Sequence, residues 1–218
     1  MWLINSSVGR KVVMSLTGLF LILFVTFHAV MNAVALISFE AYEKVCEFLG
    51  ANWYALLGTA VIAGGAVLHI IYAFWLSMQN KKARGGDAYA VSKRPANVEW
   101  ASQNMLVLGI IVFCFFVLHL YHFWAKMQLP EMMGDHPLAG KVALEAVFNQ
   151  VWVLPVYLVC FVALWFHLTH GFWSAFQSLG TTNEKWICRF KCIGFVWSTV
   201  VMGLFAVEAI YFTWFFAF

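Results

Sequence analysis

The sequence predicts an all-α integral membrane protein, a bundle of five transmembrane helices. Of its 218 residues, 63% are hydrophobic and only 11% are charged, whereas soluble domains average roughly 45–50% apolar and about 25% charged residues. An apolar run of about 20 residues crosses the hydrocarbon core of a bilayer as a helix. Five runs of that length cover residues 12–37, 53–78, 101–127, 151–179 and 190–218. The connections between them are too short for a soluble domain, so residues 1–218 are expected to form a single membrane domain.

The first run has a second interpretation, as the apolar part of a signal peptide. It follows Arg10 and Lys11 and contains the small residues Ala33, Val34 and Ala35, and basic and small residues flank the apolar region of signal peptides in this way. That region is only about 7–15 residues long in signal peptides. The longer run favours a transmembrane helix that is retained.

The distribution of basic residues predicts the orientation of the five helices, because Lys and Arg in short loops mark the cytoplasmic side. Ten of the 13 lie in the N-terminal tail and in the second and fourth connections: Arg10, Lys11, Lys81, Lys82, Arg84, Lys93, Arg94, Lys185, Arg189 and Lys191. The other three regions hold only Lys44, Lys126 and Lys141. The N-terminus is therefore expected in the cytoplasm and the C-terminus outside.

Histidines inside the apolar runs are the strongest functional signal. Only His136 of the seven lies in a connection, and the others are His28, His69, His119, His122, His167 and His170. A single histidine in a membrane helix could be a hydrogen-bonded core residue. Ionisable groups are costly in the membrane and usually functional, so histidines in four of the five helices point to one shared site or more.

The depths of these histidines sort them into two layers. At about 1.5 Å per residue, His28 and His119 lie about 5 and 7 Å to the outer side of their helix midpoints. His69 and His167 lie about 5 and 4 Å to the inner side, because the second and fourth helices run the opposite way. Two imidazoles at one depth can supply the two axial ligands of a haem iron. The sequence thus predicts two b-type haems, one above the other.

Other chemistry fits these histidines less well. Zinc requires three or four converging ligands, often with thiolates or carboxylates, and a proton relay requires acids, of which Glu208 is the only one well inside a run. The spacing leaves one choice open, however. His119 and His122 are three residues apart, as are His167 and His170, so either member of each pair could be the ligand.

Short sequence segments then resemble a known family, and the likeness extends over essentially the whole chain. The segments are SSVGRK at 6–11, LTGLF at 16–20, HAVMN at 28–32, LHIIY at 68–72, VLHLY at 117–121 and FHLTHGFW at 166–173. They resemble the cytochrome b subunit of succinate dehydrogenases and fumarate reductases, in its five-helix, two-haem class. By this resemblance the ligands are His119 and His167 rather than their neighbours.

The resemblance also implies the pairing and the surroundings of the haems. His69 with His167 would hold the inner haem, and His28 with His119 the outer haem. His122 and His170 would contact propionates or support the ligands. We further expect Ser15, Arg10 and Lys11 to hold the propionates of the inner haem, since they lie within about two helical turns of the inner boundary.

Quinone chemistry at the outer end needs a proton acceptor, because quinol oxidation releases protons together with electrons. The connection between the first two helices carries Glu40, Glu43 and Glu47 in an amphipathic stretch, residues 39–49. Glu47 precedes two apolar residues and is expected to face an apolar pocket. Its position relative to His28 resembles that of a quinol-site glutamate in some two-haem relatives, with Glu43 as the next candidate.

The resemblance implies partners that carry the other cofactors. These would be a flavoprotein subunit with FAD and an iron–sulfur subunit, both docked on the basic cytoplasmic face of a prokaryotic inner membrane. The chain itself has no G-x-G-x-x-G motif and no cysteine cluster. It would anchor the complex and exchange electrons with a quinone, menaquinone in the two-haem class.

Two other interpretations stay open from the sequence. The first is a two-haem cytochrome of a nitrate reductase, formate dehydrogenase or heterodisulfide reductase, which would differ in its soluble partner. The second is a haem-free transporter whose histidines line a substrate path. Ligands spread over four separate helices favour the succinate dehydrogenase and fumarate reductase type.

Overall fold

The computed structural model describes residues 6–84 and 99–217, and these residues form helices and their connections without a β-strand. Five of the described helices are long and apolar enough to cross a membrane, which confirms the predicted all-α, five-span fold. They are α2 (Ser7–Ile37), α4 (Trp53–Arg84), α6 (Met105–His119) together with the π-helical segment η1 (Leu120–Trp124), α9 (Val153–Ser178) and α10 (Glu184–Ala217). The orientation of the bundle relative to the cytoplasm stays a prediction.

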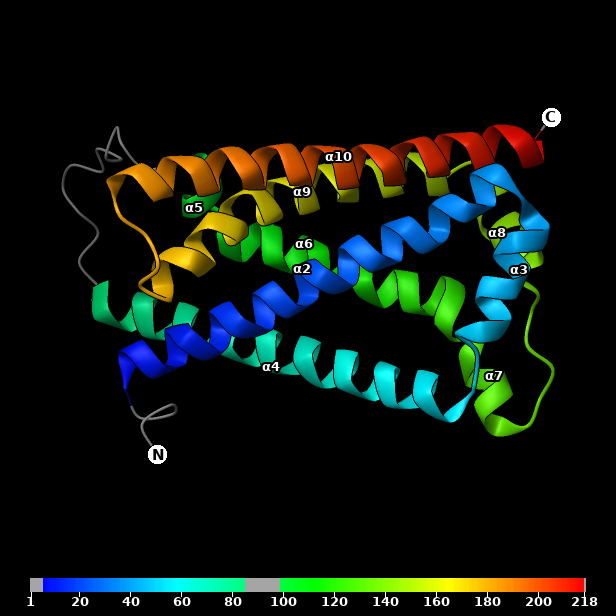
Figure 1. Ribbon diagram of the computed structural model, residues 1–218, viewed down its shortest axis with the longest axis horizontal. Helices are drawn as coiled ribbons and strands as arrows, with labels where there is room; N and C mark the ends of the chain where they lie inside the picture. Colours follow the sequence, from blue (N-terminus) through cyan, green and yellow to red (C-terminus); the bar gives the residue numbers. More distant parts are fainter. Residues whose placement is uncertain (1–5, 85–98, 218) are drawn as a thin grey trace.

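Successive spans run in opposite directions, so the remaining elements gather at the two ends of the bundle (Figure 1). At one end α2 and α10 begin and α4 and α9 end, and we call this the N-terminal end. At the opposite end α2 and α10 finish beside three short helices, and we call this the C-terminal end. The three are α3 (Phe39–Phe48), α7 (Gln128–Met133) and α8 (Gly140–Phe148).

Polar side chains fix where three of the helices begin. The Ser6 hydroxyl accepts a hydrogen bond from the Gly9 amide at the start of α2. Ser38 does the same for Ala41 at the start of α3, at 3.2 Å. The Asn183 side chain accepts from the Trp186 amide, the third residue of α10. Such caps satisfy backbone donors that the first helical turn leaves without a partner.

The third span departs from the single helix expected over residues 101–127. A separate turn, α5 (Trp100–Gln103), ends at Asn104, whose side-chain amide donates to the Trp100 carbonyl at 2.8 Å. After His119 the helix widens into a π-helical segment, η1 (Leu120–Trp124). An asparagine that bonds nearby backbone groups competes with the helical ladder, and π-helical insertions are often found at functional sites.

The buried core lies along α9, which contacts α2, α6 and α10. Buried side chains form one cluster toward the C-terminal end, comprising Ala35, Tyr42, Leu144, Val147, Phe148, Val153, Tyr157, Phe161, Ala209 and Phe212. A second cluster joins α2, α9 and α10 farther along the bundle, through Ile22, Ala29, Leu168, Val201 and Met202. Helix α4 lies at the side of this core, packed against α2. Close packing there requires Gly65, because a Cβ atom at this position would lie 2.8 Å from the Phe20 ring.

Candidate functional site

The four histidines that were expected as haem ligands come together as two pairs. The ring centroids of His28 on α2 and His119 on α6 are 5.7 Å apart, with ring planes at 88°. Those of His69 on α4 and His167 on α9 are 6.4 Å apart, with planes at 68°. These are the two combinations expected from depth and resemblance. We call them the outer pair and the inner pair, after their predicted positions.

The ring separations suit two axial ligands on opposite sides of one iron. Two metal–nitrogen bonds of about 2 Å, and roughly 1.2 Å from each ring atom to its ring centre, place such centroids about 6 Å apart. The buried Nδ1 atoms of His119 and His167 have no hydrogen-bond partner among the described residues. Buried imidazole nitrogens are normally satisfied by a partner. The residues present therefore fit a bound haem at each pair.

Three helices give the same distance between the two pairs. On α2, Gly18 touches the inner pair, since its Cβ would lie 3.3 Å from the His69 ring, and His28 follows ten residues later. On α6, Gly109 neighbours His167 and precedes His119 by ten residues. Ten helical residues span about 15 Å. The pairs thus lie in two separate layers of the bundle, somewhat farther apart than the roughly 10 Å expected from the helix midpoints.

The same spacing recurs on α9, where Tyr157 accompanies the outer pair. Its ring centroid lies 6.4 Å from that of His119, and His167 of the inner pair follows ten residues later. The Tyr157 side chain is buried and packs edge-on against Phe115 and Phe161. Aromatic side chains of this kind keep water away from the outer pair.

His122 forms a hydrogen bond with Tyr157. Its Nδ1 atom and the Tyr157 hydroxyl are 2.9 Å apart, and the His122 side chain is only 3% exposed. The π-helical segment η1 contains His122 one turn after His119. His122 therefore lies beside the outer pair with one ring nitrogen already engaged, which leaves the other for a ligand or a propionate.

Each pair also has one polar neighbour on α2. The Thr17 hydroxyl lies 3.3 Å from Nδ1 of His69. The Asn32 amide nitrogen lies 3.4 Å from both ring nitrogens of His28 and donates to the His28 carbonyl at 2.8 Å. A polar group that bonds one imidazole nitrogen fixes the ring orientation, as Thr17 can do at Nδ1 of His69, whereas Asn32 lies equally near both nitrogens of His28.

His170 is mostly buried, with a side chain that is 11% exposed, and it lies beside Glu99. Its Nδ1 atom is 3.5 Å from the Glu99 carboxylate, which also pairs with Lys191 at 2.6 Å. Partial burial acts to raise the pKa of the Glu99 carboxyl, but hydrogen bonds from Lys191 and His170 lower it overall. Glu99 is therefore ionised at neutral pH. His170 thus has an acidic neighbour in Glu99, and the Trp173 ring packs edge-on against it.

The residues expected to hold the inner propionates lie at the N-terminal end, along the first three turns of α2. Ser15 is buried, whereas Lys11 is exposed. The Arg10 guanidinium lies over the ring of Trp75 on α4, 5.3 Å from its centroid. Ser15 precedes Thr17, the hydroxyl neighbour of His69, by two residues. These residues share the end of the bundle with the inner pair, and their contact with propionates stays a prediction.

The three acids on α3 have different surroundings, and one expectation about them is corrected. Glu47 was expected to face an apolar pocket, but its side chain is exposed. Glu43 accepts hydrogen bonds from the Gly140 and Lys141 amides, at 2.8 and 2.7 Å, and so caps the start of α8. Burial had been inferred from two apolar residues that follow Glu47 in sequence. The face of an interfacial helix is set instead by which side packs on the bundle.

Three further polar groups lie on or near α3: Tyr42 and Glu208 are buried, and Cys46 is half-buried. Burial raises the pKa of the Cys46 thiol to about 11 and raises the pKa of the Tyr42 hydroxyl beyond its ordinary value. Glu208 on α10 is only 5% exposed, and its Oε1 atom has no hydrogen-bond partner among the described residues. Within that part of the chain, no three His, Cys, Asp or Glu side chains converge as a metal site. The two-histidine pairs are thus the arrangement closest to metal coordination.

Comparison with known proteins agrees with this geometry. The chain is 26% identical over 187 residues to the fumarate reductase cytochrome b subunit of Helicobacter pylori strain 26695, an alignment that covers 79% of this chain and 71% of that protein. The subunit of the same name from strain J99 is 26% identical over 156 residues, covering 69% and 59% of the two chains. The chain is related to the cytochrome b subunits of fumarate reductases.

This similarity agrees with the family that the sequence segments had indicated. No protein-family model matches the chain, and no solved structure matches it. The five apolar spans agree with a transmembrane subunit in electron transport. For a relative of cytochrome b subunits, facing histidines inside a membrane bundle are the natural haem candidates, and each pair draws its two members from different helices.

Proposed function

We propose that this chain is the dihaem cytochrome b subunit of a succinate dehydrogenase or fumarate reductase complex. It anchors the complex in the membrane and passes electrons between a quinone, menaquinone in this class, and a cytoplasmic iron–sulfur subunit. The observation that carries the proposal is the existence of two facing histidine pairs, with ring centroids 5.7 and 6.4 Å apart. The relationship to fumarate reductase cytochrome b subunits supports the choice of this complex over other quinone-linked ones.

Each pair would hold one haem b, with His28 and His119 as axial ligands of the outer one and His69 and His167 of the inner one. A bound haem supplies a carrier for single electrons at each layer. The chain's own residues orient the rings and exclude water. Asn32 and Thr17 contact one ring each, and His122, His170, Ser15, Arg10 and Lys11 are the proposed polar partners near the propionates.

The N-terminal end is proposed to face the cytoplasm, because seven basic residues lie there on α2, α4 and α10: Arg10, Lys11, Lys81, Lys82, Lys185, Arg189 and Lys191. Lys93 and Arg94 lie outside the described residues. A flavoprotein subunit with FAD and an iron–sulfur subunit would dock on this end and carry out the dicarboxylate chemistry. The chain would lie as one multi-pass domain in the inner membrane of a prokaryote, with the outer pair near the opposite surface.

Quinone is proposed to react at the outer end, with Glu47 as proton acceptor. Among the α3 acids, Glu43 is tied to the start of α8 and Glu40 pairs with Lys44 at 2.9 Å. Glu47 is exposed and close to the end of the bundle. An exposed carboxylate can exchange protons with the medium, which a proton acceptor must do after each turnover.

The test uses the purified complex and two electron donors. Glu47→Gln keeps the side-chain shape and removes the proton acceptor, so it should abolish quinol-driven fumarate reduction while dye-driven reduction and both haem spectra stay unchanged. Glu40→Gln is the matched control, since it removes a carboxylate from the same helix. Normal quinol-linked turnover in Glu47→Gln would reject this residue. A molybdopterin subunit in the mass spectrum of the complex would reject the proposed partners.

A further inference from the structure

The side chain of Gln128, the first residue of α7, joins that helix to three other parts of the chain. Its Oε1 atom accepts a hydrogen bond from the Thr59 hydroxyl on α4 at 2.9 Å and one from the Trp124 indole of η1 at 3.0 Å. Its Nε2 atom donates to the carbonyl of Gly50, between α3 and α4, at 3.0 Å. The amide uses both of its ends, and these bonds hold the last residue of η1 against α4 and the connection before it.

The segment η1, which ends at Trp124, has a wider turn than the helix before it. The Ala125 amide donates to the carbonyl of Leu120 at 2.8 Å, a bond to the fifth residue back, whereas an α-helix bonds the fourth. A turn that contains more residues rotates the chain by a smaller angle at each one. In an α-helix, side chains three positions apart lie about 60° from each other around the axis. The wider turn therefore carries His122 farther around the axis from His119 than an α-helix would.

These two histidines accordingly have different neighbours. The His119 ring faces His28, with 5.7 Å between the centroids. The His122 ring stacks on Tyr157 with 10° between the planes, and the hydrogen bond to the tyrosine hydroxyl is 2.9 Å long. It also packs against Trp152, with 5.7 Å between the centroids. Since a spacing of three residues permits either histidine to be the ligand, the π-helical turn is the feature that separates their roles.

We propose that Gln128 is a positioning residue that maintains η1 through its bond to Trp124, and that η1 in turn selects His119 rather than His122 as the axial ligand of the outer haem. This inference rests on the proposed function and adds what decides between the two histidines. A π-helical turn is rare, and this one is supported at its end by Gln128 and in its middle by the bond between His122 and Tyr157. Without the Gln128 bonds, η1 can return to an α-helix, which turns His122 toward the side of the bundle that His119 faces.

The test starts from His119→Ala in the purified complex, a variant that should lose the outer haem and keep the inner one. Adding Gln128→Met keeps the side-chain length and removes all three hydrogen bonds, so His122 can take the place of the missing ligand. In haemin titrations followed by the low-spin EPR signal, the double variant should bind the outer haem about tenfold more tightly than His119→Ala, the effect of one or two hydrogen bonds. Adding His122→Ala as a third change should abolish this gain.

Asn52→Leu in the His119→Ala background is the matched control. The Asn52 amide lies in the same connection as Gly50 and donates to backbone carbonyls of α3 rather than to η1. Its loss should therefore leave binding of the outer haem as weak as in His119→Ala alone. An unchanged spectrum of the inner haem shows that each variant is folded.

Trp124→Phe is the second variant, for the case that Gln128→Met does not fold. It keeps an aromatic ring and removes only the indole N–H that Gln128 accepts, so it should strengthen binding of the outer haem in the same direction. Binding that stays at the level of His119→Ala in both variants would overturn the proposal, as would a gain that survives His122→Ala. Two haems in the wild type without this gain reject the role of Gln128 alone, whereas a wild type without b-type bands rejects the proposed function.

Discussion

The two histidine pairs have similar ring geometry but different surroundings. The outer pair is packed against other parts of the chain, with Tyr157 and His122 beside His119 and a large hydrophobic cluster that extends to α3 and α8. Among the described residues the inner pair has fewer aromatic ring contacts than the outer pair, and Thr17 and Gly18 lie near the ring of His69. The short helices α3, α7 and α8 all lie at the outer pair's end of the bundle (Figure 1).

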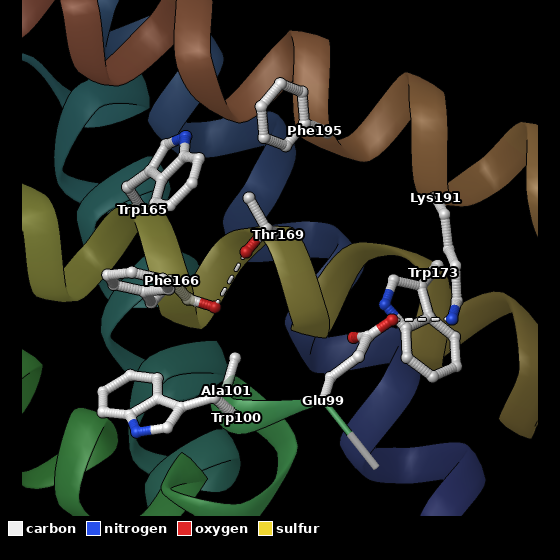
Figure 2. Close-up of a pocket in the computed structure, with 9 residues that line it drawn as sticks. All are labelled: Glu99, Trp100, Ala101, Trp165, Phe166, Thr169, Trp173, Lys191 and Phe195. Carbon is white, nitrogen blue, oxygen red and sulfur yellow. Dashed lines mark hydrogen bonds and ion pairs between the residues drawn. The ribbon is translucent and has the colours of Figure 1, made fainter. Parts of the chain in front are cut away.

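This difference suits a bundle that is proposed to exchange electrons with quinone at one end and with soluble subunits at the other. The short helices α3, α7 and α8 cover the end beside the outer pair and place polar side chains there. Such a covered end suits exchange with a small molecule from the membrane. At the end beside the inner pair, the described residues form a polar cluster of Glu99, Lys191 and His170. A hollow of about 300 Å³ between α5, α9 and α10 lies next to this cluster (Figure 2). That end is the one at which soluble partner subunits are proposed to dock, and their surfaces would complete the enclosure.

Removal of one ligand from either pair should have the largest effect. His119→Ala should lose the outer haem and His69→Ala the inner one, so each variant should fall from two haems per chain to one. A bis-imidazole iron cannot keep its low-spin state without one of its axial ligands. Pyridine haemochrome assays on purified protein measure the ratio. His136→Ala, in an exposed connection, should keep both haems, and two unchanged haems in either ligand variant would break the pairing.

The enclosure of the outer pair can be tested at Tyr157. Tyr157→Phe leaves buried Nδ1 of His122 without its partner at 2.9 Å, which should cost about 1–3 kcal/mol of stability. The outer haem spectrum should shift while the inner haem spectrum does not. Thermal unfolding followed at both sets of bands gives the measurement. A shift confined to the inner bands would contradict the assignment of His122 and Tyr157 to the outer layer.

The hydrogen bonds between α3 and α8 should contribute less to the free energy of unfolding than the bond between Tyr157 and His122. The Glu43 carboxylate accepts hydrogen bonds from the Gly140 and Lys141 amides. Glu43→Gln removes its negative charge, so it should destabilise the protein by about 1 kcal/mol. Glu40→Gln breaks only an exposed ion pair and should cost under about 0.5 kcal/mol. Urea titration of both variants compares them. Equal stability would show that Glu43 does not hold the two helices together.

The smallest effect concerns the thiol on α3. Burial holds the Cys46 pKa at about 11, so at pH 7.5 the group is a neutral thiol and reacts slowly with maleimide. The rate should rise about tenfold per pH unit up to pH 11, because only the thiolate is the nucleophile. Mass spectrometry of labelled peptides follows it, with exposed Cys188 as reference. A plateau below pH 9 would mean that Cys46 is open to solvent.

The spans could be predicted because the bilayer fixes the length of an apolar helix. The rise per residue placed His28 at the depth of His119 and His122, and the choice of His119 came from the family resemblance. The break at Asn104 and the π-helix after His119 could not be predicted from the sequence, because both depend on hydrogen bonds local to one turn. The bond between His122 and Tyr157 joins residues 35 apart, and no periodicity relates them. The exposure of Glu47 depends on how α3 lies on the bundle, which its sequence leaves open.

The haem content of the purified wild-type protein tests the central claim most directly. Two facing pairs, at 5.7 and 6.4 Å between ring centroids, predict two haems b per chain and two steps in a redox titration of the reduced-minus-oxidised bands. Because Asn32 contacts one pair and Thr17 the other, the two steps should occur at different potentials. A ratio of one haem per chain, or the absence of b-type bands, would contradict the account.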